Sequence, residues 1–407
     1  MRATASVYEQ VLDYSNRANP YPLYAELRNT PVSREEDGTY VVSTYREIAA
    51  LLHDPRISSD PRSFPEDHYQ RAAGQGELRG FIRYDPPQHD RMRRQAMRHF
   101  GPPHDPGRIE GMRPWLREVV TGLIDAFGDR NRVDIVDDLA YPFPVTVICR
   151  ILGVPREDEP RFRRWVDVVV ETIDPRLTRE PEQLRKRDES LAEFGEYLAQ
   201  LAEVHRRQPG DDLLSGLVTD PGPEGPVPQG ELLGTARLLL VAGHETTVNL
   251  ITNGMLTLLR HPDVLERLRR EPELAIATVE ELLRYEPPVH VLPWRAALDD
   301  IEIAGTTIQK GSPITLVLAS GSRDPSRFRD PDRFDPERED NAHLGFGGGI
   351  HLCFGAPLAR TEAQIALTEL ARRLENPRLV ADPPPYRKSP VLRGPRHLLV
   401  EFDRVTA

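Results

Sequence analysis

The fold is decided by one stretch of this chain of 407 residues, Phe346-Gly347-Gly348-Gly349-Ile350-His351-Leu352-Cys353-Phe354-Gly355. The stretch places one of two cysteines in a glycine-rich loop, directly before an amphipathic helix. Glycine has no Cβ and accepts positive φ, so a glycine-rich backbone can lie close to a planar ring. The free N–H groups and the positive end of the following helix stabilise a thiolate. The arrangement therefore suits a cysteine thiolate bound to the metal of a flat cofactor.

Three other interpretations of this cysteine compete with that one. A buried cysteine usually serves as a small hydrophobe, and Cys149, in the apolar run 145–149, fits that description. Cys353 does not, because a packing cysteine needs no glycines around it. A dinucleotide fingerprint fails because Ile350 stands where the third glycine belongs. A cysteine nucleophile paired with a histidine stays open, although His351 gains nothing special from lying two residues away.

A second informative segment is a long predicted helix over residues 231–259, which ends before Pro262. Its centre contains Gly243 and two threonines, which are poor choices for a helix interior. A hydroxyl there can compete for backbone hydrogen bonds and bend or open the helix. An acid beside a hydroxyl, as in Glu245-Thr246, is a pair that could deliver protons to a bound ligand. A zinc-protease motif is excluded, because no second histidine follows His244-Glu245 at the required spacing.

The cysteine loop resembles that of cytochrome P450, the family of haem-thiolate monooxygenases. The family loop Phe-x-x-Gly-x-x-x-Cys-x-Gly is filled without a gap by Phe346, Gly349, Cys353 and Gly355. The resemblance implies haem b as the cofactor and Cys353 as its metal ligand. The long helix resembles the family's Ala/Gly-Gly-x-Asp/Glu-Thr segment, which implies that Thr246 hydrogen-bonds the bound dioxygen and that Glu245 helps to bring protons.

The same resemblance assigns partners to the two haem propionates, which need cationic or hydrogen-bonding groups. His89 and Arg93 lie four residues apart on one face of a predicted helix and match the family's His-x-x-x-Arg pair. Arg295 and His351 match two further family positions. For any one of these residues alone, a solvated charge would be the ordinary interpretation.

A Glu-x-x-Arg pair, Glu281 and Arg284, lies on the predicted helix 273–286. By spacing alone this is an ordinary exposed ion pair. In the family the pair is buried and structural, and it is tied to a later arginine, here Arg338. We therefore expect these three residues to serve the fold and not the chemistry.

Composition excludes several classes of protein. The net charge of −11 argues against nucleic acid as the main partner. Two cysteines exclude a multi-bridge disulfide framework and fit a reducing cytosol. The longest uncharged helical stretch, residues 246–259, is shorter than the roughly 18–20 residues that a bilayer requires. With charged residues from position 2 onward, the chain is expected to have no membrane anchor or signal segment and to be cytoplasmic.

The periodicity predicts a mainly α protein with a minor β-sheet. Helices are expected over residues 22–28, 45–52, 115–127, 191–204 and 363–374, strands over 39–43, 301–304, 313–317 and 398–402, and a long loop over 54–86. Because these elements and the motifs interleave, residues 1–407 are expected to form one domain, similar to a cytochrome P450, with the haem between the long distal helix and the helix that follows the cysteine loop.

The resemblance implies a monooxygenase that inserts one atom of dioxygen into an organic substrate such as a natural product of secondary metabolism. Its electrons are expected from a separate ferredoxin and ferredoxin reductase, and the basic residues Arg91, Arg94 and Arg98 are a candidate docking cluster. Substrate contacts are expected in residues 60–84, 162–178 and 289–292, on the long helix, and near 391–392. Two rivals stay open: a haem-thiolate sensor or carrier without turnover, and a cysteine hydrolase without haem.

Overall fold

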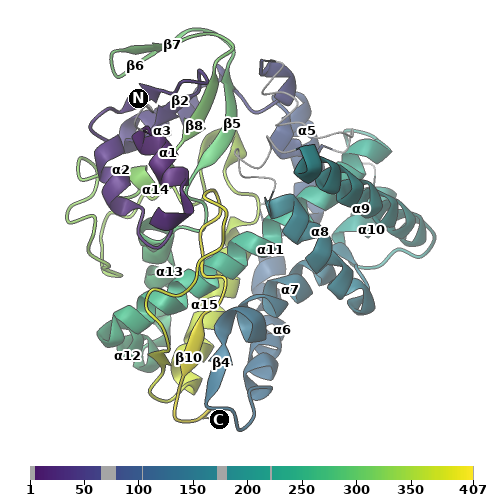
Figure 1. The fold of residues 1–407 in the computed structure, drawn as a ribbon. Helices are drawn as coiled ribbons and strands as arrows, with labels where there is room; N and C mark the ends of the chain where they lie inside the picture. Colours follow the sequence, from purple (N-terminus) through teal and green to yellow (C-terminus); the bar gives the residue numbers. More distant parts are fainter. Residues whose placement is uncertain (1–4, 66–78, 103, 172–180, 221, 407) are drawn as a thin grey trace.

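The computed structural model describes residues 5–65, 79–102, 104–171, 181–220 and 222–406 (Figure 1). Helices dominate, and the sheets are small, so the mainly α architecture predicted from the sequence is confirmed. The longer helices are α3 (Tyr45–His53), α5 (Gln88–Phe100), α6 (Pro106–Asp125), α7 (Pro142–Leu152), α8 (Glu159–Glu171), α9 (Pro181–Arg207), α11 (Gln229–Arg260), α12 (Pro262–Arg270), α13 (Ala275–Tyr285) and α15 (Ala356–Arg373). The shorter helices are α1 (Val7–Leu12), α2 (Tyr21–Leu27), α10 (Leu213–Thr219) and α14 (Leu318–Gly321).

The helix α11 crosses the centre of the molecule, with the helices α6 to α10 on one side and the main sheet with α1 to α3 on the other (Figure 1). Its 32 residues give a length of about 48 Å. Most of α11 is buried, including the polar side chains of His244, Glu245 and Asn249. The predicted helix 231–259 is therefore confirmed and extends slightly at both ends. The helix stays continuous through residues 242–247, and the Thr246 hydroxyl donates to the Ala242 carbonyl one turn earlier (2.6 Å).

The main sheet has five strands in the order β1 (Val32–Arg34), β2 (Tyr40–Val42), β8 (Pro313–Leu316), β5 (Leu292–Ala297) and β3 (Ile57–Ser58). Strands β2 and β8 pair in parallel, and the other neighbours pair antiparallel. The pairing of β5 with β8 contains a bulge, because Leu292 and Arg295 are three positions apart on β5 while their partners, Leu316 and Ile314, are two positions apart on β8. Buried aliphatic side chains, among them Val42, Ile314 and Leu316, hold the sheet against α3.

The smaller sheets are the hairpin β6 (Ile301–Ile303) with β7 (Thr306–Ile308), and the group β4 (Arg132–Asp134), β10 (Leu399–Glu401) and β9 (Arg378–Leu379). The predicted strands around 301–304, 313–317 and 398–402 are thus confirmed. The predicted long loop over 54–86 contains β3 and two 3₁₀ turns, Pro61–Ser63 and Phe81–Arg83; residues 66–78 lie outside the described residues. Across the described ranges, every helix is too short or too polar to span a membrane.

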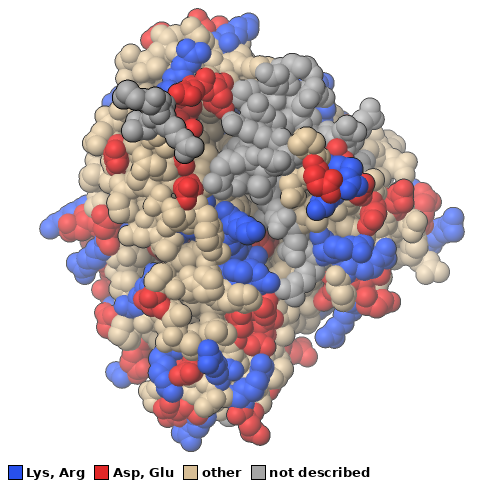
Figure 2. All heavy atoms as spheres, in the orientation of Figure 1, with Lys and Arg blue, Asp and Glu red and all other residues tan. Residues whose placement is uncertain are grey.

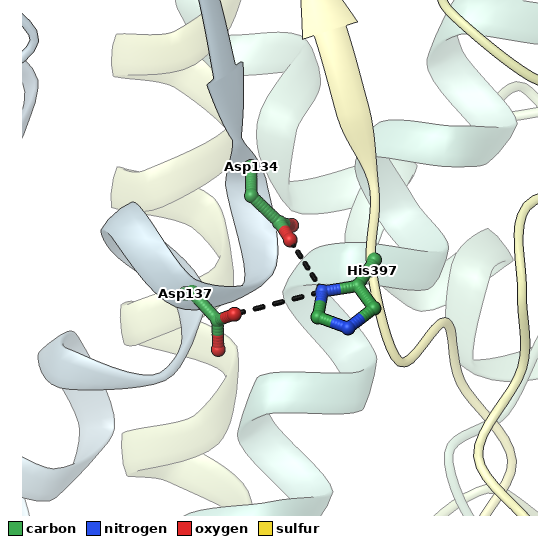
Figure 3. A group of neighbouring side chains, drawn as sticks. All are labelled: Asp134, Asp137 and His397. Atoms are coloured by element: carbon green, nitrogen blue, oxygen red, sulfur yellow. Dashed lines mark hydrogen bonds and ion pairs between the residues drawn. The ribbon is translucent and has the colours of Figure 1, made fainter.

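A cluster of three polar side chains, Asp134, Asp137 and His397, ties the C-terminal strand to the body of the molecule (Figure 3). His397 Nδ1 lies 2.6 Å from Asp134 Oδ2 and 3.5 Å from Asp137 Oδ2. The second oxygen of Asp134 accepts from the backbone N–H groups of Val136 (3.0 Å) and Leu398 (2.9 Å). Because these carboxylates already have donors, we interpret the group as a structural anchor rather than a metal site.

The predicted structural network around Glu281 is confirmed. Both Glu281 and Arg284 have side chains with 0% exposure, and Arg284 Nη2 lies 2.7 Å from Glu281 Oε1. Arg338 Nε lies 3.4 Å from the second oxygen of Glu281. The pair is buried, as the family resemblance implied, and not exposed, as its spacing alone suggested.

Candidate active site

A cavity lies between α11 and the glycine-rich loop that precedes α15. Most of its wall is apolar, with contributions from Phe81, Leu239, Leu250 and Phe354. Cys353 lines the cavity from the loop, and Thr246 lines it from α11. The structure therefore brings together the two motifs that carry most of the sequence argument, although they are more than a hundred residues apart.

The backbone of the loop explains its glycines. Gly349 has a φ of +62°, and a Cβ at that position would lie 1.9 Å from the carbonyl oxygen of Leu52. Gly347 also has positive φ, +68°. The Cys353 N–H donates to the carbonyl of Phe346 (3.0 Å), which closes the loop across its glycines. Positive φ therefore favours glycine at both positions, and at Gly349 the close approach of α3 leaves no room for a side chain.

Burial and nearby groups shift the pKa of the Cys353 thiol in opposite directions. Burial is the largest and raises the pKa of Cys353, while the backbone N–H of Gly355 and the positive charge of Arg93 oppose it. Because burial wins, the bare side chain is held as the thiol. A metal cation at this position would supply the charge that a buried thiolate needs. Cys149 is buried in the core with 1% exposure, and burial raises its pKa to about 12, as expected for a packing residue.

His351, which lines the cavity, lies against a second histidine, His89, with ring centroids 4.6 Å apart. His89, on α5, is 1% exposed, and its Nδ1 lies 2.8 Å from Asp90 Oδ1. His351 Nε2 lies 3.0 Å from the Ser59 hydroxyl. The other ring nitrogens, His89 Nε2 and His351 Nδ1, are buried without a hydrogen-bond partner among the described residues.

Two arginines complete this group. Arg93 Nη2 donates to the carbonyl of Leu352 (2.7 Å), and its guanidinium lies over the rings of Phe81 and Phe354. Arg295 is 6% exposed, and burial lowers its pKa to about 10. Without an inserted residue, side chains three apart on a strand would point to opposite faces. The bulge in β5 therefore lets Leu292 and Arg295 both line the cavity.

The four predicted propionate partners lie close to one another. The pKa of His351 falls to about 3, first through burial and then through the positive charges of Arg295, His89 and Arg93. Such crowding of cationic groups, with two unused buried ring nitrogens, is unfavourable unless an anion is bound. The donor set therefore fits a planar cofactor with anionic side chains, and Cys353 fits its metal.

The structure separates the two predicted catalytic residues. Thr246 faces the cavity, whereas Glu245 is 1% exposed and lies outside the cavity wall. Arg387, in the segment before β10, places its Nε 2.8 Å from Glu245 Oε1. Sequence reasoning missed Arg387, because nothing in its surrounding sequence marks it as a partner of α11.

A second missed residue is Glu362, on α15. Glu362 lines the cavity, is 2% exposed, and has a buried Oε1 without a hydrogen-bond partner among the described residues. Burial raises its pKa well above the ordinary value, so the side chain is held neutral. The helical spacing of residues 363–374 could indicate the helix but not this buried acid beside the cavity.

The three arginines of the candidate docking cluster on α5 are each paired with a carboxylate, and docking at this face stays a prediction. Arg91 pairs with Glu231 (2.7 Å), Arg94 with Glu224 (3.1 Å) and Arg98 with Asp220 (2.7 Å). Each charge is thus matched by a carboxylate, two from the segment before α11 and one, Glu231, from its first turn. On the face shown in Figure 2, positive and negative side chains are likewise intermixed.

Some of the residues predicted to contact the substrate line the cavity, and the contacts themselves stay a prediction. Leu239, Thr247, Val289 and Leu292 line the cavity. Val391 and Leu392 instead lie in a buried cluster with the N-terminal helices, which Val241 also contacts. Parts of the predicted regions 60–84 and 162–178 lie outside the described residues.

Comparison with known proteins shows that the chain belongs to the cytochrome P450 family, whose model matches residues 32–402. The cytochrome P450 monooxygenase PikC of Streptomyces venezuelae is 41% identical over 95% of this chain and 92% of its own length. The 6-deoxyerythronolide B hydroxylase of Saccharopolyspora erythraea is 37% identical over 94% of this chain and 96% of its own. The solved structure of CYP164A2 from Mycobacterium smegmatis has a TM-score of 0.89 and 38% identity, and covers 97% of this chain and 99% of the other. The protein is therefore an oxidoreductase of a monooxygenase family that uses haem b, as the sequence predicted.

Proposed function

We propose that this P450 inserts one atom of dioxygen into a medium or large organic natural product, with Cys353 as the ligand of the haem iron. The observation that carries the proposal is the cavity wall, on which Cys353 and Thr246 face one space lined by apolar side chains. One relative is named as a hydroxylase of 6-deoxyerythronolide B, which supports a natural product as the substrate class. Haem b, when bound, supplies the dioxygen chemistry, and the thiolate donates electron density that favours O–O cleavage.

The four cationic and imidazole residues would hold the propionates. Arg93 and Arg295 offer guanidinium donors, and the buried His89 Nε2 and His351 Nδ1 have unused hydrogen-bonding capacity. Charge-assisted hydrogen bonds from these groups are roughly twice as strong as neutral ones. In this role the four residues orient the cofactor plane and fix the distance between its metal and Cys353.

The residues of α11 would control protons. The Thr246 hydroxyl lies on the cavity wall and can turn from the Ala242 carbonyl to a bound ligand, because the two bonds compete for one proton. Arg387 holds the Glu245 carboxylate beside this position, outside the cavity. Glu362 lies on α15, the helix that follows the cysteine loop, and is given no part in this proton path.

We propose that electrons come from a ferredoxin and a ferredoxin reductase, because residues 32–402 match one P450 model and the sequence contains no recognisable flavin or iron–sulfur module. Because the three arginines of α5 are paired with carboxylates, docking at this face stays a prediction. We also propose that the chain acts as one domain, since α1 and α2 pack in one cluster with Val317 and Val391. The cytoplasmic location stays a prediction.

The proposal is tested with Cys353→Ser and its matched control Cys149→Ala. The reduced wild-type protein with carbon monoxide should show the red-shifted absorption band of thiolate-ligated haem. We expect Cys353→Ser to lose this band and Cys149→Ala to keep it, because Cys149 lies in the core, away from the cavity. An unchanged band in Cys353→Ser would place the ligand elsewhere, and a purified wild type without haem would revive the hydrolase alternative.

A further inference from the structure

One ring nitrogen of His351 contacts a buried serine. His351 lines the cavity, and its Nδ1 is buried without a hydrogen-bond partner among the described residues. The other ring nitrogen, Nε2, lies 3.0 Å from the hydroxyl of Ser59, which is 0% exposed. Ser59 comes directly after strand β3, in a part of the chain for which the sequence predicted only a loop. The tertiary structure therefore gives this histidine a partner that no sequence motif marks.

Two elements hold Ser59 in this place. Strand β3 pairs antiparallel with β5, and Ser58 lies opposite Ala296. One further step of this register sets Ser59 opposite Arg295, which lines the cavity. The Ser59 N–H donates to Asp85 Oδ1 (3.0 Å), and the Ser58 hydroxyl donates to the second oxygen of the same carboxylate. The sheet edge and the carboxylate before α5 together fix the Ser59 hydroxyl beside the imidazole.

The Ser59 hydroxyl determines which nitrogen of the imidazole carries a proton. The hydroxyl has one proton and two acceptors within reach, His351 Nε2 at 3.0 Å and the carbonyl of Tyr84 at 3.4 Å. Donation to the nearer acceptor, Nε2, leaves the single proton of a neutral imidazole on Nδ1. The Nδ1–H group can then donate to an anion, whereas the other tautomer would present a lone pair and repel it.

We propose that Ser59 is a positioning residue of the cofactor site, which holds His351 in the tautomer whose Nδ1–H binds a haem propionate. This inference rests on the proposed function, in which His351 and Arg295 hold the propionates. Asp85 supports both residues, because it anchors the Ser59 N–H and lies near Arg295. Burial lowers the pKa of Arg295 to about 10, and the negative charge of Asp85 opposes this shift. In metal sites, loss of the outer partner that fixes a histidine tautomer costs about 10–100-fold in affinity.

The test measures haem retention and the reduction potential of the haem-loaded enzyme. Transfer of haem to apomyoglobin, followed optically, gives the rate of haem loss, and a redox titration gives the midpoint potential. We expect Ser59→Ala to lose haem about tenfold faster than the wild type. Its midpoint potential should fall, because a propionate with one donor fewer favours the ferric state. The matched control Ser43→Ala removes a similarly buried hydroxyl, which donates to the Leu27 carbonyl (3.0 Å), and should change neither quantity.

A double-mutant cycle separates positioning from packing. His351→Leu should lose haem faster than the wild type, and Ser59→Ala should add nothing further in that background, because the serine then has no imidazole to orient. Independent effects of the two substitutions, or a wild-type rate and potential in Ser59→Ala, would overturn the proposal. Should Ser59→Ala not fold, Ser59→Cys provides the same comparison, because a thiol is a weaker donor. The carbon monoxide band, measured on each variant, shows whether thiolate ligation stands and so separates failure of this inference from failure of the proposed function.

Discussion

Removal of the Arg284 side chain should destabilise the protein more than any surface substitution. Its guanidinium makes two bonds to Glu281, of 2.7 and 2.8 Å. It also donates to the backbone carbonyls of Ser322 (3.1 Å), Pro331 (2.7 Å) and Arg333 (3.0 Å). Arg284 therefore ties α13 to the chain that runs toward the cysteine loop.

In Arg284→Ala the carboxylate of Glu281 stays buried and loses its main cation. Breaking a buried ion pair from one side costs about 3–5 kcal/mol, which is a large part of the roughly 5–15 kcal/mol by which a domain is stable. We expect the free energy of unfolding, measured by urea denaturation followed by circular dichroism, to fall by about this amount.

The double variant Glu281→Leu/Arg284→Leu provides the internal control. It removes both charges together, so it should lose less stability than Arg284→Ala, and the coupling energy follows from the double-mutant cycle. Arg267→Ala, which breaks an exposed ion pair with Glu337, should leave the unfolding midpoint unchanged. A loss below about 1 kcal/mol in Arg284→Ala would refute the reasoning, because it would place Glu281 in contact with water or with another cation.

Three further predictions concern pH and the candidate site. Burial acts to raise the pKa of Glu280, but hydrogen bonds from His343 and Arg360 lower it to about 2 from an ordinary 4.5. The stability that this carboxylate adds is therefore present above pH 4.5 and is lost as the pH falls toward 2. Over this interval the free energy of unfolding should depend less on pH in Glu280→Gln than in the wild type. Thr246→Ala should release more hydrogen peroxide, and form less product, for each electron pair consumed. If the ratio of product to electron pairs stayed at the wild-type value, Thr246 would have no role in proton delivery. Arg295→Ala should lower the haem content per protein after purification because a propionate loses a buried donor, and wild-type haem content would remove Arg295 from the set.

The cysteine loop and the long helix were predictable because both are local. The backbone has positive φ at positions 347 and 349, and glycine adopts this conformation without strain because it has no Cβ. The preference for glycine there does not depend on which side chains lie nearby. The apolar periodicity of α11 is equally local, and its length follows from the next proline. These two segments determined the family and its cofactor before any contact was known.

The tertiary structure determines which charged side chains form pairs and which ones line the cavity. Arg387 reaches Glu245 across more than a hundred residues of sequence, and the bulge in β5 turns Arg295 toward the cavity. The arginines of α5, which the sequence offered as a docking cluster, are neutralised by carboxylates of another segment. The sequence alone determined the loop, the central helix and the overall class, because those depend on backbone geometry and periodicity within a few turns. The pairing and burial of side chains depend on which distant segments meet, and only the packed chain specifies that.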